Sequence, residues 1–545
     1  MPQVSGYIGT GKSLSFIKLN NTDSTTKFIS YMSFLKSKAA LEPLTGINLI
    51  LATLALGLGS FMNILDISIA NVSLPSIAGD FAISPTQGTW VITSYAVSEA
   101  IMLPLTGWLA GRFGDIRQFT IATLLFTLAS FFCGAAQSFE MLLFARVLQG
   151  IVGASMIPLS QSLIIKIFPE DKRGAALGIW SLTTIVAPVL GPIIGGWLTD
   201  NYVWRYVFFI NIPFGLLCAY AVTKTMKGRE SEIVKKPIDK VGLALLTVGI
   251  GTLQILLDKG NELDWFESST IVSLAVVSGL SLIIFVIWEF GEEHPIVDLK
   301  LFQIRNFLVS AICLTVGSFA FYIFVVIGPL WMQTQMGYTP TIAGEVMAVT
   351  GILSLFFGPF FGINLGRIGA REVATIGFIA FGLSAWASGS ITTDVSYQHL
   401  QYVRLLMGMG IAGFFVPMTA ISLSQLEPNQ ISSGTGLTNF LRNMGGSVGT
   451  AVGATIWQDQ AAANHANLVE HFSLGSYGYD QYVTSMAKQG LVEGEWTQNL
   501  ERIVNSQAYL LSTNHLLIMS GVIMVCLIPV IWFAKPPFGG GGGGH

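Results

Sequence analysis

The residues that could carry chemistry are charged side chains inside apolar runs. Asp66 lies in the segment LDISIANVSLP, residues 65–75. An ionised carboxylate within a membrane span costs about 2.5–3.5 kcal/mol even on permissive insertion scales. Such a group can bind and release a proton, or it can be a structural carboxylate that a neighbouring Asn or Arg satisfies. We expect the proton role, because ionisable residues inside membrane spans are functional by default.

One glutamate and three arginines share this placement. Arg146 does not readily lose its proton, so we expect it either to modulate a nearby acid or to be a strut that bonds backbone carbonyls. Glu99 could titrate, hold a cationic substrate, or pair with Arg404 or Arg146. Arg442 also lies in the middle of an apolar run. The predicted proton-coupling residues are therefore Asp66, Arg146, Glu99 and Arg442.

The segment GYIGTGKS, residues 6–13, matches the phosphate-binding pattern G-x-x-x-x-G-K-[ST]. A working loop of this kind needs a strand before it and a helix after it, within an α/β domain. Here only five residues precede the match, and no other polar segment is long enough to supply a sheet. We therefore expect a chance match and a protein that uses a proton gradient, with no nucleotide, other cofactor or metal.

The composition is that of a membrane protein. Of the 545 residues, 52% are hydrophobic and 11% are charged, and the mean hydropathy is +0.63. Soluble domains carry roughly 25% charged residues. The net charge of -3 gives no indication of a nucleic-acid partner. The sequence contains no acid–base pair, Ser/His/Asp set or metal-binding cluster that supports an enzyme.

Fourteen apolar runs are long enough to predict an all-α membrane protein. A spanning helix needs about 20 mostly apolar residues. The runs cover residues 47–75, 88–108, 119–136, 141–165, 174–197, 205–223, 241–257, 269–289, 307–332, 341–362, 373–391, 400–424, 433–457 and 512–534.

Basic residues predict the orientation of these spans. With the N-terminus in the cytoplasm, 21 of the 28 Lys and Arg residues lie on the cytoplasmic side. Because loops rich in Lys and Arg stay in the cytoplasm, we expect both termini there. Segment 458–511 then lies outside, where its polar and aromatic residues indicate an ordered amphipathic hairpin.

The chain also repeats itself. GWLAGRFG (107–114) recurs as GINLGRIG (362–369), at an offset of 255 residues. RVLQG (146–150) recurs as RLLMG (404–408), at an offset of 258 residues. This offset spans eight helices, so two duplicated six-helix halves with a two-helix insertion explain it.

The repeat therefore predicts five parts of the chain. They are a disordered cytoplasmic extension (1–45), an N-terminal six-helix half (46–228), a two-helix insertion (229–295), a C-terminal six-helix half that includes the outer segment (296–534), and a Gly-rich cytoplasmic tail (535–545).

Two further segments contain residues that could close the transport pathway on one side of the membrane. In GWLAGRFGDIRQF the glycines permit a tight turn, and the charged residues could lock the inner gate through ion pairs, although a plain cytoplasmic loop would carry similar charges. In APVLGPIIGG the spaced glycines indicate a close helix crossing, and the prolines would kink the helix. The predicted gating residues are Gly107, Arg112, Gly114, Asp115, Arg117, Pro188, Gly191, Pro192 and Gly195.

Aromatic and Met side chains from both halves are candidates for the wall of a substrate cavity. Each of them could equally face lipid or lie in the core. The candidates are Trp90, Tyr95, Tyr322, Phe415 and Met418.

Together these segments resemble the fourteen-helix drug:proton antiporter branch of the major facilitator superfamily. Similar motifs are LDISIANVSLP, GWLAGRFGDIRQF, FARVLQGIVGA, APVLGPIIGG, WRYVFFINIPFG and NFLRNMGGSVG. The ending WFAKPPFGGGGGGH is similar to the tail of multidrug exporters of this branch. The superfamily loop motif has an acid where this sequence has Gly111, with Asp115 shifted downstream, so the ion-pair gating attributed to that acid is not carried over.

The resemblance implies a transporter of the bacterial inner membrane that exports hydrophobic drugs and toxic amphiphiles in exchange for protons. It also implies a tripartite pump, in which the partners are a periplasmic adaptor of the EmrA type and an outer-membrane channel of the TolC type. The alternative is a proton-coupled uptake symporter of the same fold. The APVLGPIIGG motif and the outer segment 458–511 argue against that alternative.

Overall fold

The computed structural model describes residues 43–83, 85–169, 172–231, 233, 237–427, 430–471, 477–488, 493–536 and 538. Within these residues all regular elements are helices. Residues 1–42 of the predicted extension, which include the GYIGTGKS match, lie outside the described residues, as does most of the Gly-rich tail.

Ten α-helices and one 3-10 helix make up the described part of the N-terminal half, residues 46–228. Pro104 lies in the short 3-10 turn that separates α4 from α5, as expected for a residue that cannot continue the helical hydrogen-bond ladder. Two of the α-helices, α3 and α10, are single turns of four residues. The helices are α2 (Gly46–Asp80), α3 (Pro85–Gly88), α4 (Trp90–Met102), η1 (Leu103–Leu105), α5 (Thr106–Phe113), α6 (Asp115–Gly134), α7 (Phe139–Gly153), α8 (Met156–Ile167), α9 (Arg173–Asn201), α10 (Tyr206–Phe209) and α11 (Asn211–Thr225).

The insertion and the C-terminal half are also helical. The insertion contains α12 (Lys240–Lys259), η3 (Trp265–Glu267) and α13 (Ser269–Gly291). The C-terminal half contains η4 (Leu299–Gln303), α14 (Arg305–Thr334), α15 (Pro340–Ile368), α16 (Ala370–Ser388), α17 (Tyr397–Leu405), α18 (Met407–Leu423), α19 (Ile431–His471), α20 (Tyr477–Lys488), α21 (Glu493–Cys526) and α22 (Ile528–Ile531).

Ten helical stretches in the described part of the chain are long and apolar enough to cross a membrane. Every predicted run overlaps one or more helices, although the runs 119–136, 373–391 and 512–534 continue a few residues past the last helical residue. The count of fourteen spans stays a prediction. The outward faces of the helices are apolar, as on α13, where Ile283 is 60% and Ile287 is 69% exposed. In lipid, a helix satisfies all its backbone hydrogen bonds internally, which is why apolar runs of this length fold as helices.

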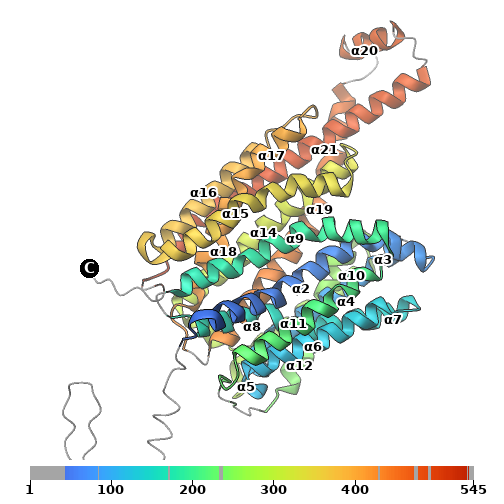
Figure 1. The fold of residues 1–545 in the computed structure, drawn as a ribbon. Helices are drawn as coiled ribbons and strands as arrows, with labels where there is room; N and C mark the ends of the chain where they lie inside the picture. The colour runs from blue at the N-terminus through green and yellow to red at the C-terminus, as the bar shows by residue number, and fades with distance from the viewer. Residues whose placement is uncertain are drawn as a thin grey trace, which may run out of the picture. The chain divides into compact units, whose positions relative to one another are not determined.

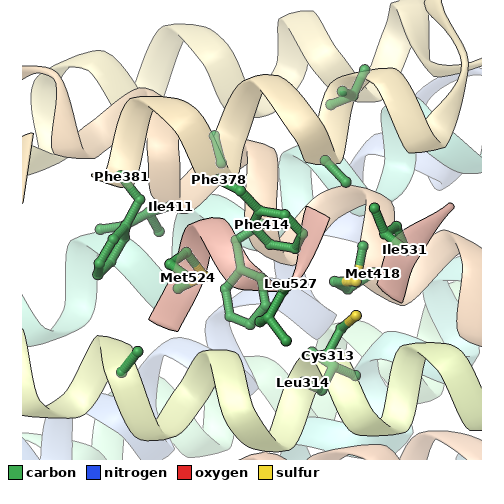
Figure 2. Close-up of a cluster of buried hydrophobic side chains, with 14 of the residues drawn as sticks. Cys313, Leu314, Phe378, Phe381, Ile411, Phe414, Met418, Met524, Leu527 and Ile531 are labelled. Atoms are coloured by element: carbon green, nitrogen blue, oxygen red, sulfur yellow. The ribbon is translucent and has the colours of Figure 1, made fainter. Parts of the chain in front are cut away.

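Each half has a packed core of its own. Figure 2 shows the core of the C-terminal half, where Phe378 of α16 packs against Phe414 of α18 and Phe381 lies beside Ile411. Leu527, at the end of α21, packs into the same cluster. In the N-terminal half, Phe119 and Phe126 of α6 are fully buried against α2 and α8. Large buried rings of this kind dominate the packing of a core.

The two halves meet along α9 and α15, which cross the middle of Figure 1 between α6 and α7 on one side and α16 and α17 on the other. A Cβ atom at Gly178 of α9 would lie 2.5 Å from the carbonyl oxygen of Gly358 in α15. One helical turn earlier, Gly174 stands in the same relation to Gly362. Small residues therefore let the two backbones approach closely.

The insertion contacts both halves. Lys259, at the end of α12, lies 5.3 Å from the ring centroid of Trp90 in α4, and Asp258 accepts a hydrogen bond from Thr93 at 2.6 Å. On the other side, the indole nitrogen of Trp265 donates to Thr455 of α19 at 2.8 Å. The insertion thus lies against α4 and α19.

The described parts of segment 458–511 are helical, as expected of an ordered segment. Its position on the outer side of the membrane stays a prediction. α19 continues without interruption to His471, and α21 extends beyond the end of α15 toward α20 (Figure 1). His465 of α19 and Glu501 of α21 are 3.0 Å apart.

A close backbone crossing between two helices of the C-terminal half generates a stability prediction. A Cβ atom at Gly377 of α16 would lie 2.4 Å from the carbonyl carbon of Gly413 in α18. Gly377→Val should lower the free energy of unfolding by about 1–3 kcal/mol, because it overpacks this crossing. The measurement is thermal unfolding of the detergent-solubilised protein, followed by tryptophan fluorescence.

Gly279→Val in α13 is the matched control, because a Cβ atom there meets nothing within 4 Å. Both variants place the same β-branched residue inside an apolar helix. Equal melting temperatures for the two variants would contradict the prediction.

Candidate functional site

A buried ion pair lies at the centre of the N-terminal half. Asp66 of α2 and Arg146 of α7 have side chains that are 0% exposed, and Nη1 of Arg146 donates to Oδ2 of Asp66 at 2.6 Å. The structure therefore brings together Asp66 and Arg146, two of the four residues that the sequence analysis predicted for proton coupling. Removing two charges from water costs several kcal/mol for each ion, so such a pair persists only when further hydrogen bonds complete it.

Neutral side chains from three other positions complete the pair. Oδ1 of Asp66 accepts hydrogen bonds from Asn211 of α11 at 2.7 Å and from Gln149 of α7 at 3.0 Å. Both amides also donate to Ser130 of α6, at 3.2 and 2.8 Å. The sequence analysis missed these three residues. Gln149 had a signal, because it lies three residues after Arg146 and so on the same helix face.

Arg146 is held from several directions. Its Nε donates to the carbonyl oxygen of Val91 in α4 at 3.0 Å, and its Nη1 also donates to Gln149 at 2.7 Å. The guanidinium carbon lies 4.5 Å from the ring centroid of Tyr95 and 5.5 Å from that of Phe208. Both expected roles, charge partner of an acid and strut to a backbone carbonyl, are present in one side chain.

Tyr95 connects this pair to Glu99. Its hydroxyl donates to Oε1 of Glu99 at 3.4 Å, one turn along α4. Tyr95 is 1% and Glu99 is 7% exposed. Neither Arg146 nor Arg404 forms an ion pair with Glu99, so the expected pairing alternatives are not what the described side chains show.

The C-terminal half has an equivalent of Arg146 but no equivalent of Asp66 at the corresponding position. Arg404, the repeat equivalent of Arg146, is 1% exposed. Its guanidinium donates to the sulfur of Met347 and lies 5.5 Å from the ring centroid of Phe324. The repeat offsets of 255–258 residues place Phe321 to Phe324 opposite Asp66. The duplication therefore carries one buried carboxylate–guanidinium pair among the described residues.

A second polar cluster joins the two halves at one end of the bundle, which we call the Asp115 end. Asp115, at the start of α6, is 3% exposed. It forms an ion pair with Lys166 of α8 and accepts from Ser432 of α19 at 3.0 Å. Lys166 donates to Ser432 at 3.2 Å, and Ser162 lies 3.0 Å from the same hydroxyl.

The glycines of this loop permit close contacts. A Cβ atom at Gly107 would lie 2.1 Å from Oγ of Ser433, across the two halves. Gly114 has φ of +89° and packs on Glu230, where a side chain would be strained. The turn at this point thus requires glycine.

The charged residues of the loop have different partners. Of the three expected to lock the gate, Asp115 has a described partner in the other half, Ser432. Arg117 lies 3.9 Å from Glu230, in the linker after α11, which also accepts from the backbone nitrogens of Ile116 and Arg117 at 2.9 Å. The guanidinium of Arg112 lies 5.5 Å from the ring centroid of Trp108.

One turn deeper, a second polar contact crosses the halves. Gln161 of α8 accepts from the side-chain nitrogen of Asn439 in α19 at 3.0 Å. The nitrogen of Gln161 donates to Thr419 of α18 at 3.3 Å. Two successive layers of hydrogen bonds therefore hold α8 to the C-terminal half near the Asp115 end.

The opposite end of α2 is fixed by another acid. Asp80 accepts from the indole nitrogen of Trp204 at 3.0 Å and pairs with Arg205 at 2.8 Å. These two donors hold the pKa of Asp80 below its usual value. The WRYVFFINIPFG segment thus anchors the loop end of α2 and, through Asn211, also supplies a partner to Asp66.

The APVLGPIIGG segment lies within α9 and crosses α2. A Cβ atom at Gly191 would lie 2.2 Å from Oγ of Ser68, and one at Gly195 would lie 3.2 Å from the carbonyl oxygen of Ile69. The tight crossing that the spacing predicts is present, beside the helix that carries Asp66. The side chains of Pro188 and Pro192 lie outside the described residues.

The five candidate cavity residues have different positions. Tyr95 is part of the buried network, and Trp90 lies beneath Lys259 at the insertion. Met418 is fully buried in the core shown in Figure 2, the alternative that the sequence left open. Tyr322 and Phe415 are half-buried beside α19. Their role in substrate binding stays a prediction.

Comparison with known proteins gives a consistent assignment. Residues 56–450 match the family model described as Major Facilitator Superfamily. The chain is 40% identical over 504 residues to the multidrug export protein EmrB of Escherichia coli strain K12, covering 92% of this chain and 98% of that protein. It is 41% identical over 503 residues to the fatty acid resistance protein FarB of Neisseria gonorrhoeae, covering 92% and 99%.

Solved structures agree on the fold. The human organic anion transporter MFSD10 (TETRAN) superimposes with a TM-score of 0.55 at 13% identity, covering 88% of this chain and 100% of that chain. A bacterial homologue of the human lysosomal transporter Spinster gives a TM-score of 0.51 at 16% identity, covering 91% and 100%.

The resemblance that the motifs predicted is confirmed over nearly the whole chain, including its similarity to EmrB-type proteins. The chain therefore belongs to the major facilitator superfamily and is a transporter rather than an enzyme.

Proposed function

We propose that this protein exports hydrophobic drugs and toxic amphiphiles across the inner membrane of a bacterium, in exchange for protons. The names of two similar proteins, a multidrug export protein and a fatty acid resistance protein, support these substrate classes. The family resemblance supports a tripartite pump with an EmrA-type adaptor and a TolC-type outer-membrane channel.

The proposed orientation places the Asp115 end in the cytoplasm. The distribution of basic residues supports it, since 21 of the 28 Lys and Arg residues then lie on that side. In this orientation, the hydrogen bonds from Ser432 to Asp115 and from Asn439 to Gln161 close the cytoplasmic side. Both must break before substrate can enter from the cytoplasm.

The observation that carries the proton step is the buried pair of Asp66 and Arg146. Protonation of Asp66 would remove the negative charge that balances Arg146 and would leave two amide donors facing a neutral acid. Because both side chains are 0% exposed, a proton reaches Asp66 only when the surrounding helices move. Proton binding and helix movement are then one event, which is the coupling that an antiporter needs.

Tyr95 and Glu99 connect the Asp66–Arg146 pair to the surface that faces the other half. The Tyr95 ring lies on Arg146, and its hydroxyl bonds to Glu99. Arg442 of α19 lies at a similar depth on the other half, where Gly436 of α19 packs against Leu103 of the same segment as Glu99. We propose that a change of charge at Asp66 reaches the surface where the halves meet along this route.

The first test is Asp66→Asn in proteoliposomes. The variant should lose uphill efflux driven by a proton gradient, because an amide cannot carry the proton. It should still exchange labelled drug for unlabelled drug without a gradient. Full uphill efflux by Asp66→Asn would contradict the proposed role.

The double variant Asp66→Asn/Arg146→Gln separates transport from folding. Removing one partner of a buried ion pair costs about 3–5 kcal/mol, whereas removing both charges costs less. The double variant should therefore be more stable than Asp66→Asn but should still lack uphill efflux. The measurements are thermal unfolding and the same efflux assay.

The second test concerns the source of energy. Lys12→Ala should leave efflux unchanged, because we propose that the GYIGTGKS match binds no nucleotide. The assay is drug efflux from cells with a proton gradient intact, with and without depletion of ATP. Loss of efflux together with loss of ATP binding in this variant would contradict the proposal.

A further inference from the structure

Arg442 is a cation without a bonded counter-charge at the meeting of the two halves. It lies on α19, and its guanidinium carbon is 5.9 Å from the ring centroid of Phe415 in α18. Among the described residues, no carboxylate lies within 4.0 Å of it. It is only partly buried, so it can be reached when the halves move.

The facing acid lies on the other half. α4 and α19 run in opposite directions, and a Cβ atom at Gly436 of α19 would lie 3.2 Å from the carbonyl oxygen of Leu103. Glu99 of α4 lies four residues before Leu103, and Arg442 lies six residues after Gly436 in α19. Because the two helices are antiparallel, both residues lie on the same side of this contact, at about 6 and 9 Å along the helix axes for a rise of 1.5 Å per residue. The two charges are thus at similar depth.

Glu99 and Arg442 nevertheless do not bond to each other. The described hydrogen bond of Glu99 comes from Tyr95 at 3.4 Å. The acid and the guanidinium therefore lie on opposite halves without a described hydrogen bond or ion pair between them. A guanidinium in this position retains donors for an acceptor that approaches between the halves.

The surroundings of Arg442 are aromatic. Phe415 meets Phe321 of α14 edge-on, with ring centroids 5.6 Å apart. The ring of Tyr322 packs against Gly446, one turn after Arg442, where a Cβ atom would lie 2.8 Å away. Below this group, the hydrogen bond between Gln161 and Asn439 closes the side toward the Asp115 end.

We propose that Arg442 binds the anionic group of amphiphilic substrates, such as a carboxylate, while Phe415 and Tyr322 contact the apolar body. The inference rests on the proposed export function and names a determinant of its specificity. Arg is suited to this role, because its planar and weakly hydrated guanidinium donates two parallel hydrogen bonds to a carboxylate. Neutral drugs would use the aromatic contacts alone.

The test uses two probes with the same apolar body, 4-octylbenzoate and the neutral 4-octylbenzamide. Binding to the purified full-length protein is measured by calorimetry. Arg442→Gln should weaken benzoate binding roughly tenfold or more, the size expected for a hydrogen bond to a charged group. Binding of the benzamide should change by less than about twofold, since it lacks the charge.

Two further variants sharpen the result. Arg442→Lys keeps the charge without the planar fork and should retain part of the benzoate binding. Arg502→Gln removes an exposed guanidinium that donates a hydrogen bond to Asn499 on α21. This variant should bind both probes like the wild type. The wild type alone should prefer the benzoate, a comparison that does not depend on any variant folding.

Three results would contradict the proposed role of Arg442. Equal binding of benzoate by the wild type and Arg442→Gln would overturn it, as would equal loss of both probes or a wild type without preference. These results leave the proposed export function standing. A wild type that binds neither probe and exports neither would overturn the proposed function and, with it, this inference.

Discussion

The N-terminal half is organised around the requirement that a buried carboxylate be balanced. Asp66 has a counter-charge in Arg146, and its second oxygen depends on amides of Gln149 and Asn211. These partners come from α7 and α11, and Ser130 of α6 supports both amides. Four helices are therefore held in register by one charge. An incomplete set would leave a buried ion with the full cost of desolvation.

The two halves share a fold but not this charge. Arg404 repeats Arg146, yet it faces the ring of Phe324 and the sulfur of Met347. One half of the duplicated fold therefore holds a buried carboxylate–guanidinium pair, and the other holds a guanidinium in apolar surroundings. Under the proposed proton coupling, protonation of Asp66 would change the energy of one half relative to the other.

The sequence was sufficient for the helices and for Asp66 with Arg146, because hydropathy and buried charge are local signals. It was not sufficient for Asn211, a neutral residue whose importance depends on a contact 145 positions away along the chain. Lys166 was also missed, since a basic residue near a helix end is explained by topology alone. Its bond to Asp115 exists only because α8 and α6 pack side by side near Ser432.

α19 is one uninterrupted helix of 41 residues, or about 60 Å at 1.5 Å per residue. It carries Ser432 at the Asp115 end, Arg442 ten residues further along, and His465 near its far end beside α21. Because the helix has no break, its two ends move together when it tilts. A tilt of α19 that separates Ser432 from Asp115 would also displace His465, so a movement at the Asp115 end of the bundle would reach the helices at its other end.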